Sequence, residues 1–286
     1  MENIERYKHL NKYLKEKFGE RTLKICIDGG FTCPNRDGTK GIGGCIFCSE
    51  KGSGEHIKSK TFDFATDTNI KCSIPIPASN DVTDQTLSIS TQVKNYFNSY
   101  KAERANKFIA YFQNFTNTYD SIENLKKKYD SALIDNRIVG LEVATRPDCI
   151  TEDIAKLLKS YTDKYYVCVE LGLQTADEEI GKFINRCYTN EDFSHAVALL
   201  NKYGIDVVTH IMLGLPNNTY ESKSKQYKPD NEIFYQFLNS SFASDTIKTV
   251  NFINNHNIQG LKIHSCYVVK NTKLEELYKA EKYIPL

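Results

Sequence analysis

Six short apolar runs alternate with helical segments along the chain, and this alternation limits the folds that the chain can adopt. The runs have the composition of strands and cover residues 23–28, 107–112, 138–144, 165–171, 205–213 and 259–264. Helical patterns occupy 87–105, 121–133, 151–161, 178–185, 190–203, 233–254 and 272–280. Such strand–helix repeats form a parallel sheet covered by helices. Six repeats are too few for a closed eight-stranded barrel, so an open, partial (β/α)6 barrel and a doubly wound sheet are both compatible with the pattern.

The other segments are arranged around this one α/β domain, which we place at residues 23–286. Residues 1–22 carry a helical apolar stripe and are predicted to form an N-terminal cover helix. Two polar stretches, near 55–90 and 217–230, lack a clear period and are interpreted as loop insertions. No apolar run approaches the roughly 18 residues of a membrane span, so no membrane association is expected.

Cysteine usage indicates the compartment. The nine cysteines are odd in number, and the N-terminus lacks an apolar signal core, which disfavours a secreted disulfide framework. We therefore expect a cytoplasmic protein in which metal binding outranks disulfides. The 37 Lys and Arg residues balance 36 Asp and Glu residues, so the net charge does not indicate nucleic-acid binding. The sequence does not indicate an oligomeric state.

A glycine-rich loop after the first predicted strand carries three cysteines, Cys33, Cys45 and Cys48, spaced C-x11-C-x2-C. Three thiolates can hold three corners of an iron–sulfur cluster or three positions of a zinc ion. In the first case one metal position stays open, as a catalytic site requires. In the second, His56 closes a Cys3His site, and the protein is a zinc-binding interaction module without catalysis.

Polar residues follow or end the predicted strands. They are Asp28, Gln113 with Asn114, Thr145 with Arg146, Glu170 with Gln174, His210 and His264. The carboxyl ends of parallel strands meet at one edge of a sheet, where α/β proteins place their ligands. We therefore expect one shared cleft; the alternative is that some of these residues cap the next helix.

The cysteine loop and five later motifs resemble the radical S-adenosylmethionine (SAM) family, in its bacterial YhcC-like group, which is related to the catalytic subunit of Elongator. The motifs lie at 33–49, 110–119, 143–149, 169–175, 210–216 and 258–264. The resemblance implies a partial (β/α)6 barrel and a 4Fe–4S cluster on Cys33, Cys45 and Cys48. It also implies that SAM binds the open iron and is cleaved by one electron, from a low-potential donor of the flavodoxin or ferredoxin type, to a 5′-deoxyadenosyl radical.

Further residues are expected to hold SAM if the resemblance is correct. Phe47 would shield the cluster and pack on adenine, which Met212 would also line. Gln113 and Asn117 would bind the methionine amino end, and Glu170 would bind the ribose hydroxyls. Gln174, one turn after Glu170, is also expected among the residues that bind the cofactor. Arg186 would pair with the methionine carboxylate.

The same resemblance suggests tRNA as the substrate, through modification of a wobble uridine side chain, whereas a protein or small-molecule substrate is the alternative. Three departures from the family's sequence pattern weaken the transfer of the family's activity to this chain. Cys187-Tyr188-Thr189 replaces the usual Gly-His-Thr, Asn217-Asn218-Thr219 replaces Gly-Glu-Thr, and the family's C-terminal helix and strand are missing after Leu286. A member that keeps the cluster without turnover is therefore a further alternative.

Overall fold

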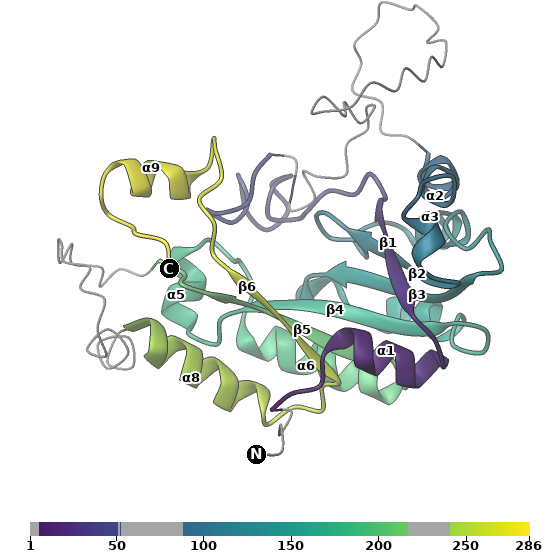
Figure 1. Cartoon of the computed structure of the whole chain (residues 1–286). Helices are drawn as coiled ribbons and strands as arrows, with labels where there is room; N and C mark the ends of the chain where they lie inside the picture. Colours follow the sequence, from purple (N-terminus) through teal and green to yellow (C-terminus); the bar gives the residue numbers. More distant parts are fainter. Residues whose placement is uncertain (1–5, 51, 53–87, 217–240) are drawn as a thin grey trace, which may run out of the picture.

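The computed structural model describes residues 6–50, 52, 88–216 and 241–286. Its centre is a six-stranded parallel sheet in which the strands follow one another in the order β1-β2-β3-β4-β5-β6 (Figure 1). A doubly wound sheet would reverse direction part-way across the order. The consecutive order therefore confirms the partial (β/α)6 barrel.

The strands match the predicted runs closely, with the largest difference at the carboxyl end of β4. They are β1 (Thr22–Asp28), β2 (Lys107–Gln113), β3 (Ile138–Thr145), β4 (Tyr166–Gln174), β5 (Asp206–Leu213) and β6 (Gly260–Ser265). Because β4 continues to Gln174, Glu170 lies in the middle of that strand. His210 likewise lies within β5, so these two side chains face the interior of the half-barrel rather than its rim.

Several helices begin where the sequence supplies a capping side chain. Ser121, Thr151 and Thr189 each accept a hydrogen bond from the first turn of the helix that follows. The helices are α1 (Leu10–Phe18), α2 (Ile89–Phe97), α3 (Ile122–Asp130), α4 (Glu152–Lys159), α5 (Glu178–Phe183), α6 (Asn190–Lys202), α8 (Ser241–Ile253) and α9 (Lys273–Lys279). Most of the expected insertion at 55–90, and all of that at 217–230, fall outside the described residues.

Helix α1 covers the amino ends of the strands. Its Phe18 ring packs edge-on against Tyr166 at the start of β4, and the Tyr13 hydroxyl donates to Asp206 at the start of β5 (3.2 Å). Lys107, which begins β2, donates to the Phe18 carbonyl (2.7 Å). The predicted cover helix thus closes the end of the half-barrel that lies opposite the cysteine loop.

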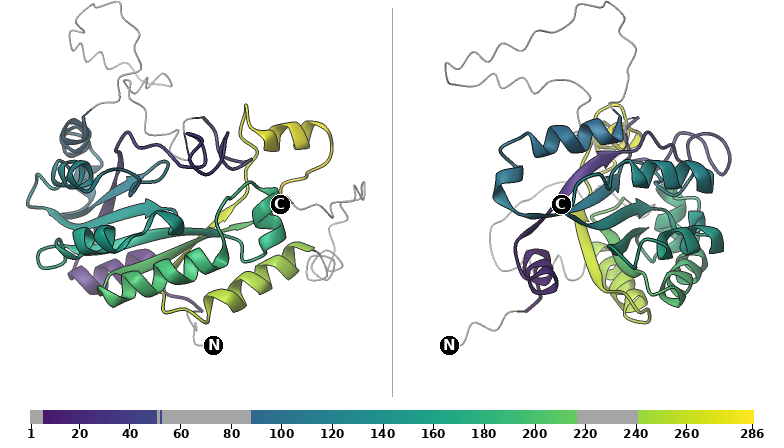
Figure 2. Two further views of the ribbon diagram at one scale, coloured as in Figure 1. Left: turned by 180° about the vertical axis from the view of Figure 1, so that it is seen from behind. Right: turned by 90° about the vertical axis from the view of Figure 1, so that its right-hand side faces the viewer.

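The two faces of the sheet differ in character, because successive side chains of a strand point to opposite sides. The outer face carries apolar residues such as Ile25, Phe108 and Val169, which form the main core with the connecting helices. Figure 2 shows those helices gathered on one side of the sheet, with β1 and β6 at its two edges. The inner face carries polar and charged residues, including Lys24, Glu142 and Lys262.

A second, smaller apolar cluster lies at the carboxyl end of the sheet. It joins the cysteine loop to α5, β5 and the C-terminal segment through Ile46, Ile180, Ile184, Met212, Leu215, Cys266, Leu274 and Tyr283. Backbone bonds reinforce the contact: Ile46 N–H donates to the Ile184 carbonyl (3.1 Å), and Leu274 N–H donates to the Ile46 carbonyl (3.0 Å). The cysteine loop is therefore fixed against elements that are remote in the sequence.

Candidate active site at the carboxyl ends of the strands

The cysteine loop leaves β1 and folds into a series of tight turns over the carboxyl ends of the strands. Arg36 N–H donates to the Cys33 carbonyl (2.8 Å), and Cys48 N–H donates to the Cys45 carbonyl (2.9 Å). Gly43 and Gly44 have φ values of 81° and 79°, which a residue with a Cβ rarely adopts. The glycines thus allow the chain to turn sharply and present three thiols from one short segment.

The three thiols lie close enough to influence one another. Burial, and next the neighbouring Cys48 thiol, raises the pKa of Cys45 to about 12, with Cys33 contributing in the same direction. All three are free cysteines. Without a cation the Cys45 thiol is therefore protonated at neutral pH, whereas a bound iron centre favours the thiolate that ligates it.

Two side-chain N–H groups point at these sulfurs. Arg146, which follows β3, donates from Nη1 to Cys33 Sγ (3.9 Å), and Asn35 donates from Nδ2 to Cys45 Sγ (3.7 Å). Donors of this kind are common partners of cluster thiolates. The donor set of three thiols with N–H groups directed at the sulfurs therefore fits an iron–sulfur cluster.

Arg146 is itself held in place by a chain of charges. Its Nε and Nη2 bind the two oxygens of Asp148 (both 2.9 Å), and Asp148 also pairs with Lys40 of the cysteine loop (2.8 Å). Burial would raise the pKa of Asp148, but the hydrogen bonds and charges of Arg146 and Lys40 hold that pKa below its usual range. The Asp148 carboxylate is therefore ionised at neutral pH and fixes the direction of the Arg146 guanidinium.

The turn after α5 interlocks with the cysteine loop. Asn35 Nδ2 donates to the Asn185 carbonyl (2.5 Å), and Asn185 Nδ2 donates to the Gly44 carbonyl (2.8 Å). Asn185 and Cys187 both have positive φ values, 57° and 59°. Cys187 adopts this left-handed conformation although it carries a Cβ, so the turn accommodates a side chain at the position where the resemblance implies glycine.

Arg186, which we predicted to bind the methionine carboxylate, is fully buried and has no donor left for a ligand. Its guanidinium donates to the carbonyls of Tyr188, Leu173 and Thr175 and to the side chains of Glu178 and Asn190. A guanidinium has five N–H groups, and all are used. In this arrangement Arg186 connects the end of β4 to the turn before α6.

Phe47 and Met212 lie in the same apolar cluster at the carboxyl end of the sheet, with Phe47 partly exposed and Met212 buried. Gln113 ends β2 and is partly exposed beside Asp28, its neighbour in register. Asn117 is fully buried; its Nδ2 donates to the Asn114 and Ala144 carbonyls, whereas its Oδ1 has no partner. The structure thus brings Phe47 and Met212 together, and it gives Asn117 a structural role in the loop after β2.

Glu170 lies at the centre of a buried network on the inner face. Its two carboxylate oxygens accept hydrogen bonds from Lys262 Nζ and the Tyr111 hydroxyl (both 2.8 Å). Burial would raise the pKa of Glu170, but the Lys262 charge and these hydrogen bonds hold that pKa below its ordinary value. Both oxygens already have partners, so a ribose hydroxyl would have to share them.

Gln174 occupies the end of β4, where the pairing with β5 shifts in register. Its φ is 60°, and its Oε1 accepts a hydrogen bond from the Tyr188 hydroxyl. Gly172 leaves room for this side chain, because an added Cβ there would lie 2.7 Å from Gln174 Nε2. Gln174 is partly exposed at the rim and is positioned by Tyr188.

Two histidines continue the inner face towards the open edge at β6. The rings of His210 and His264 meet edge to face with centroids 5.0 Å apart, and burial lowers the pKa of His210 to about 4. His210 is therefore neutral at physiological pH, and its buried Nε2 has no hydrogen-bond partner. An unpaired buried nitrogen is costly, so this atom indicates a position where a bound molecule or water would be accommodated.

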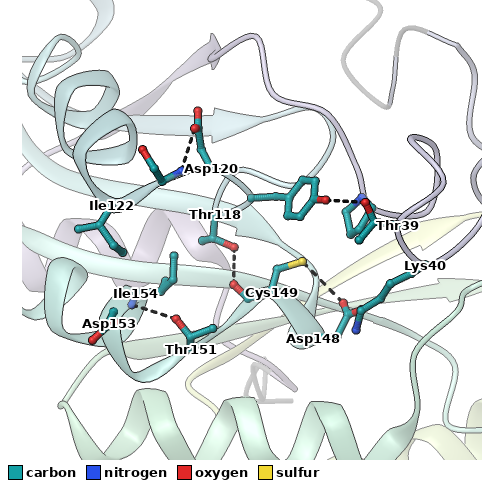
Figure 3. Close-up of a pocket in the computed structure, with 13 residues that line it drawn as sticks. Thr39, Lys40, Thr118, Asp120, Ile122, Asp148, Cys149, Thr151, Asp153 and Ile154 are labelled. Atoms are coloured by element: carbon teal, nitrogen blue, oxygen red, sulfur yellow. Dashed lines mark hydrogen bonds and ion pairs between the residues drawn. The ribbon is translucent and has the colours of Figure 1, made fainter.

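A cavity of about 550 Å³ flanks the cysteine loop on its outer side (Figure 3). It lies between Thr39 and Lys40 of the loop and the segments that open α3 and α4. Cys149 lines it beside Asp148, and the Thr39 hydroxyl bonds that of Tyr119 across one side (2.9 Å). Lys40 and Asp148, which support Arg146, therefore both line this cavity.

The zinc alternative requires side chains that converge on one ion. Among the residues that the structure describes, no group of three or more His, Cys, Asp or Glu is placed to hold a single metal ion, and His56 lies outside them. A 4Fe–4S cluster would not require the three thiolates to converge on one ion, because each thiolate would bind a different iron.

A comparison with protein-family models identifies the Radical SAM superfamily over residues 33–224. Protein YtqA of Bacillus subtilis is 34% identical over 277 residues, covering 97% of this chain and 71% of YtqA. This chain belongs to the radical SAM superfamily. The radical SAM protein is accordingly an enzyme, and its family implies a 4Fe–4S cluster and SAM as cofactors.

Further relatives confirm the YhcC-like and Elongator-related character. Protein YhcC of Escherichia coli is 28% identical over 268 residues, or 93% of this chain and 70% of YhcC. A tRNA uridine(34) acetyltransferase of Methanocaldococcus jannaschii is 34% identical over 166 residues, or 58% of this chain and 26% of the relative. The shared segment with the acetyltransferase is thus a minor part of that protein.

A solved structure confirms the fold. The archaeal Elp3 of Methanocaldococcus infernus, with an N-terminal deletion, superposes with a TM-score of 0.55 at 17% identity, covering 93% of this chain. The radical SAM protein spans 50% of the length of that Elp3 chain. Within its described residues, no helix is both long and apolar enough to cross a membrane.

Several residues of this site were missed by the sequence interpretation. Arg146 was noted only as a polar residue at a strand end, and Asn35, Lys40 and Lys262 were given no role. Arg146-Pro147-Asp148 lies within one of the recognised motifs, so a charged pair flanking a proline was the available signal. Lys262 alternates with two apolar residues of β6, which also places it on the inner face.

Replacing Asp148 by asparagine is expected to destabilise the radical SAM protein by about 1–3 kcal/mol at neutral pH, because two charged hydrogen bonds are lost. The pKa of Asp148 is lower in the folded than in the unfolded protein, so its contribution is present above the unfolded value and is lost as pH falls through the folded value. Urea unfolding of both proteins between pH 7 and roughly pH 3 should show curves that converge in acid. A difference that is constant with pH would contradict the assignment.

Proposed function

We propose that the protein cleaves SAM reductively at a 4Fe–4S cluster bound by Cys33, Cys45 and Cys48 and modifies the side chain of a tRNA wobble uridine. The arrangement of three adjacent thiols with two N–H donors directed at their sulfurs carries the cofactor part of this proposal. The substrate part is supported by the 34% identity over 166 residues to a relative named for uridine 34 of tRNA.

When bound, the cluster and SAM supply a one-electron cleavage that yields methionine and a 5′-deoxyadenosyl radical able to take a hydrogen atom from a substrate. The chain's own residues orient these groups. Phe47 and Met212 offer an apolar surface beside the cysteine loop for the adenine. Gln113 and Gln174 are partly exposed at the rim and supply amide groups for the polar ends of SAM, whereas Asn117 supplies one unpaired carbonyl oxygen inside that rim.

The inner face of the sheet lies next to this rim and would receive the substrate. Lys262, Glu170 and Tyr111 form a hydrogen-bonded set whose charges balance, and Glu170 would share its carboxylate with a ribose hydroxyl. Beside Glu170, the neutral His210 has a buried Nε2 atom without a hydrogen-bond partner. This combination suits a neutral, polar group such as a nucleobase better than a free ion.

The reaction also needs an electron and a nucleic acid from outside the chain. We propose a low-potential donor of the flavodoxin or ferredoxin type and tRNA in the cytoplasm as the partners. The near-balanced charge of the chain predicts that tRNA binding depends on local basic segments, such as Lys126-Lys127-Lys128 on α3, rather than on net charge.

Transfer RNA from cells that lack the gene provides the test of substrate. The anaerobically reconstituted protein, incubated with reductant, SAM and this tRNA, should change the mass of the wobble nucleoside in a digest analysed by mass spectrometry. If 5′-deoxyadenosine accumulates while every tRNA nucleoside stays unchanged, a protein or small molecule is the substrate instead.

A further inference from the structure

Arg146 is positioned by two independent anchors so that one N–H group faces the cysteine loop. Asp148 binds Nε and Nη2, and the carbonyls of Arg186 and Cys187 accept further hydrogen bonds at 3.1 and 3.3 Å. The Arg146 side chain is only 9% exposed and that of Asp148 only 1%. Such a guanidinium has little freedom, and the Nη1 group that it directs at Cys33 Sγ is held there at 3.9 Å.

The local charge around this contact is positive. Lys40, Asp148 and Arg146 form a row of alternating signs that ends on Cys33 with a guanidinium. Reduction adds one electron to an iron–sulfur cluster and makes it more negative. A positive, hydrogen-bonding group on a ligating sulfur stabilises the reduced state more than the oxidised state, and so raises the reduction potential.

We propose that Arg146 is a positioning residue that raises the reduction potential of the cluster through its N–H group on Cys33, with Asp148 and Lys40 as the support that aims it. The inference rests on the proposed cluster ligation by Cys33. Its consequence is that the protein, and not only the external electron donor, determines how readily the cluster accepts the electron that SAM cleavage requires.

The chain contains a matched control at the other end of the same strand. Arg137 precedes β3 and binds both oxygens of Asp135 through Nε and Nη2 at 2.9 Å, just as Arg146 follows β3 and binds Asp148. The two pairs share residue types, sequence separation and bonding geometry. Only the pair at the carboxyl end contacts the cysteine loop, so Arg137→Met reproduces the loss of an arginine–aspartate pair without the contact to Cys33.

The experiment is an anaerobic redox titration of the reconstituted protein without SAM, followed by electron paramagnetic resonance of the reduced cluster. Arg146→Met should lower the ratio of reduced to oxidised cluster at a fixed potential by about tenfold, equivalent to 59 mV for one electron. Arg146→Lys, which keeps the charge but not the planar fork, should show a smaller decrease. Arg137→Met should titrate as the wild type does.

Iron content separates the outcomes. An Arg146→Met or Arg146→Lys protein with the wild-type amount of iron and an unchanged titration would overturn the inference and leave the proposed function intact. If Arg146→Met binds no iron, the titration of Arg146→Lys decides alone. A wild-type protein that assembles no cluster under these conditions would overturn the inference together with the proposed function.

Discussion

Replacing Cys45 by alanine is expected to remove the iron–sulfur cluster and, with it, all formation of 5′-deoxyadenosine. Burial and the Cys48 thiol both raise the pKa of Cys45, and Asn35 donates a hydrogen bond to its sulfur. Loss of one of three ligands leaves the cluster without a complete attachment. Iron analysis of the reconstituted protein should fall from about four irons per chain to a small fraction of that value.

Cys149→Ala is the matched control. Cys149 is buried, and burial raises the pKa of its thiol to about 12, as it does that of Cys45, but Cys149 follows β3 and lies outside the cysteine loop. The iron content of this variant and the visible absorption of its cluster should stay near the wild-type level. Equal iron contents in Cys45→Ala and wild type would show that the loop does not ligate the cluster.

The largest loss of stability is expected from Arg186→Met, at about 3–5 kcal/mol. The substitution removes five hydrogen bonds from a side chain that is fully buried. It leaves the carbonyls of Leu173, Thr175 and Tyr188 without that donor, and each unpaired buried group costs about 1–3 kcal/mol. Urea unfolding monitored by circular dichroism should show the change as a much lower midpoint.

Lys182→Met on the neighbouring helix α5 supplies the comparison, since its pair with Glu179 is exposed to solvent and should contribute little to stability. Arg186 was first interpreted as a ligand for the SAM carboxylate. A variant with wild-type stability and weakened SAM binding would restore that role and refute the structural one.

The order of strands and helices was predictable because each element carries its own periodicity. The runs that include Ile25, Phe108 and Val169 are short, rich in apolar residues and separated by helical patterns, and this signal needs no knowledge of the rest of the chain. The cysteine loop was equally predictable from the sequence, since all three thiols lie within one short segment. The choice between a half-barrel and a doubly wound sheet required the strand order, which local periodicity does not encode.

The partners of individual side chains were not predictable in the same way. Asn35 bonds Asn185, 150 residues later, and Lys262 bonds Glu170 across 92 residues. Such contacts depend on the curvature of the sheet and on where β4 ends, four residues beyond Glu170 at Gln174. The surroundings of Arg186 were not predictable either, because a lone arginine in a motif gives no sign of whether carbonyl groups will surround it.

Formation of 5′-deoxyadenosine tests the central claim most directly. The reconstituted protein, incubated anaerobically with SAM and a low-potential reductant, is expected to release 5′-deoxyadenosine and methionine in equal amounts, with more turnover when the tRNA substrate is present. Cys45→Ala serves as the blank. A protein that carries an intact cluster and still forms no 5′-deoxyadenosine, with or without tRNA, would contradict the account.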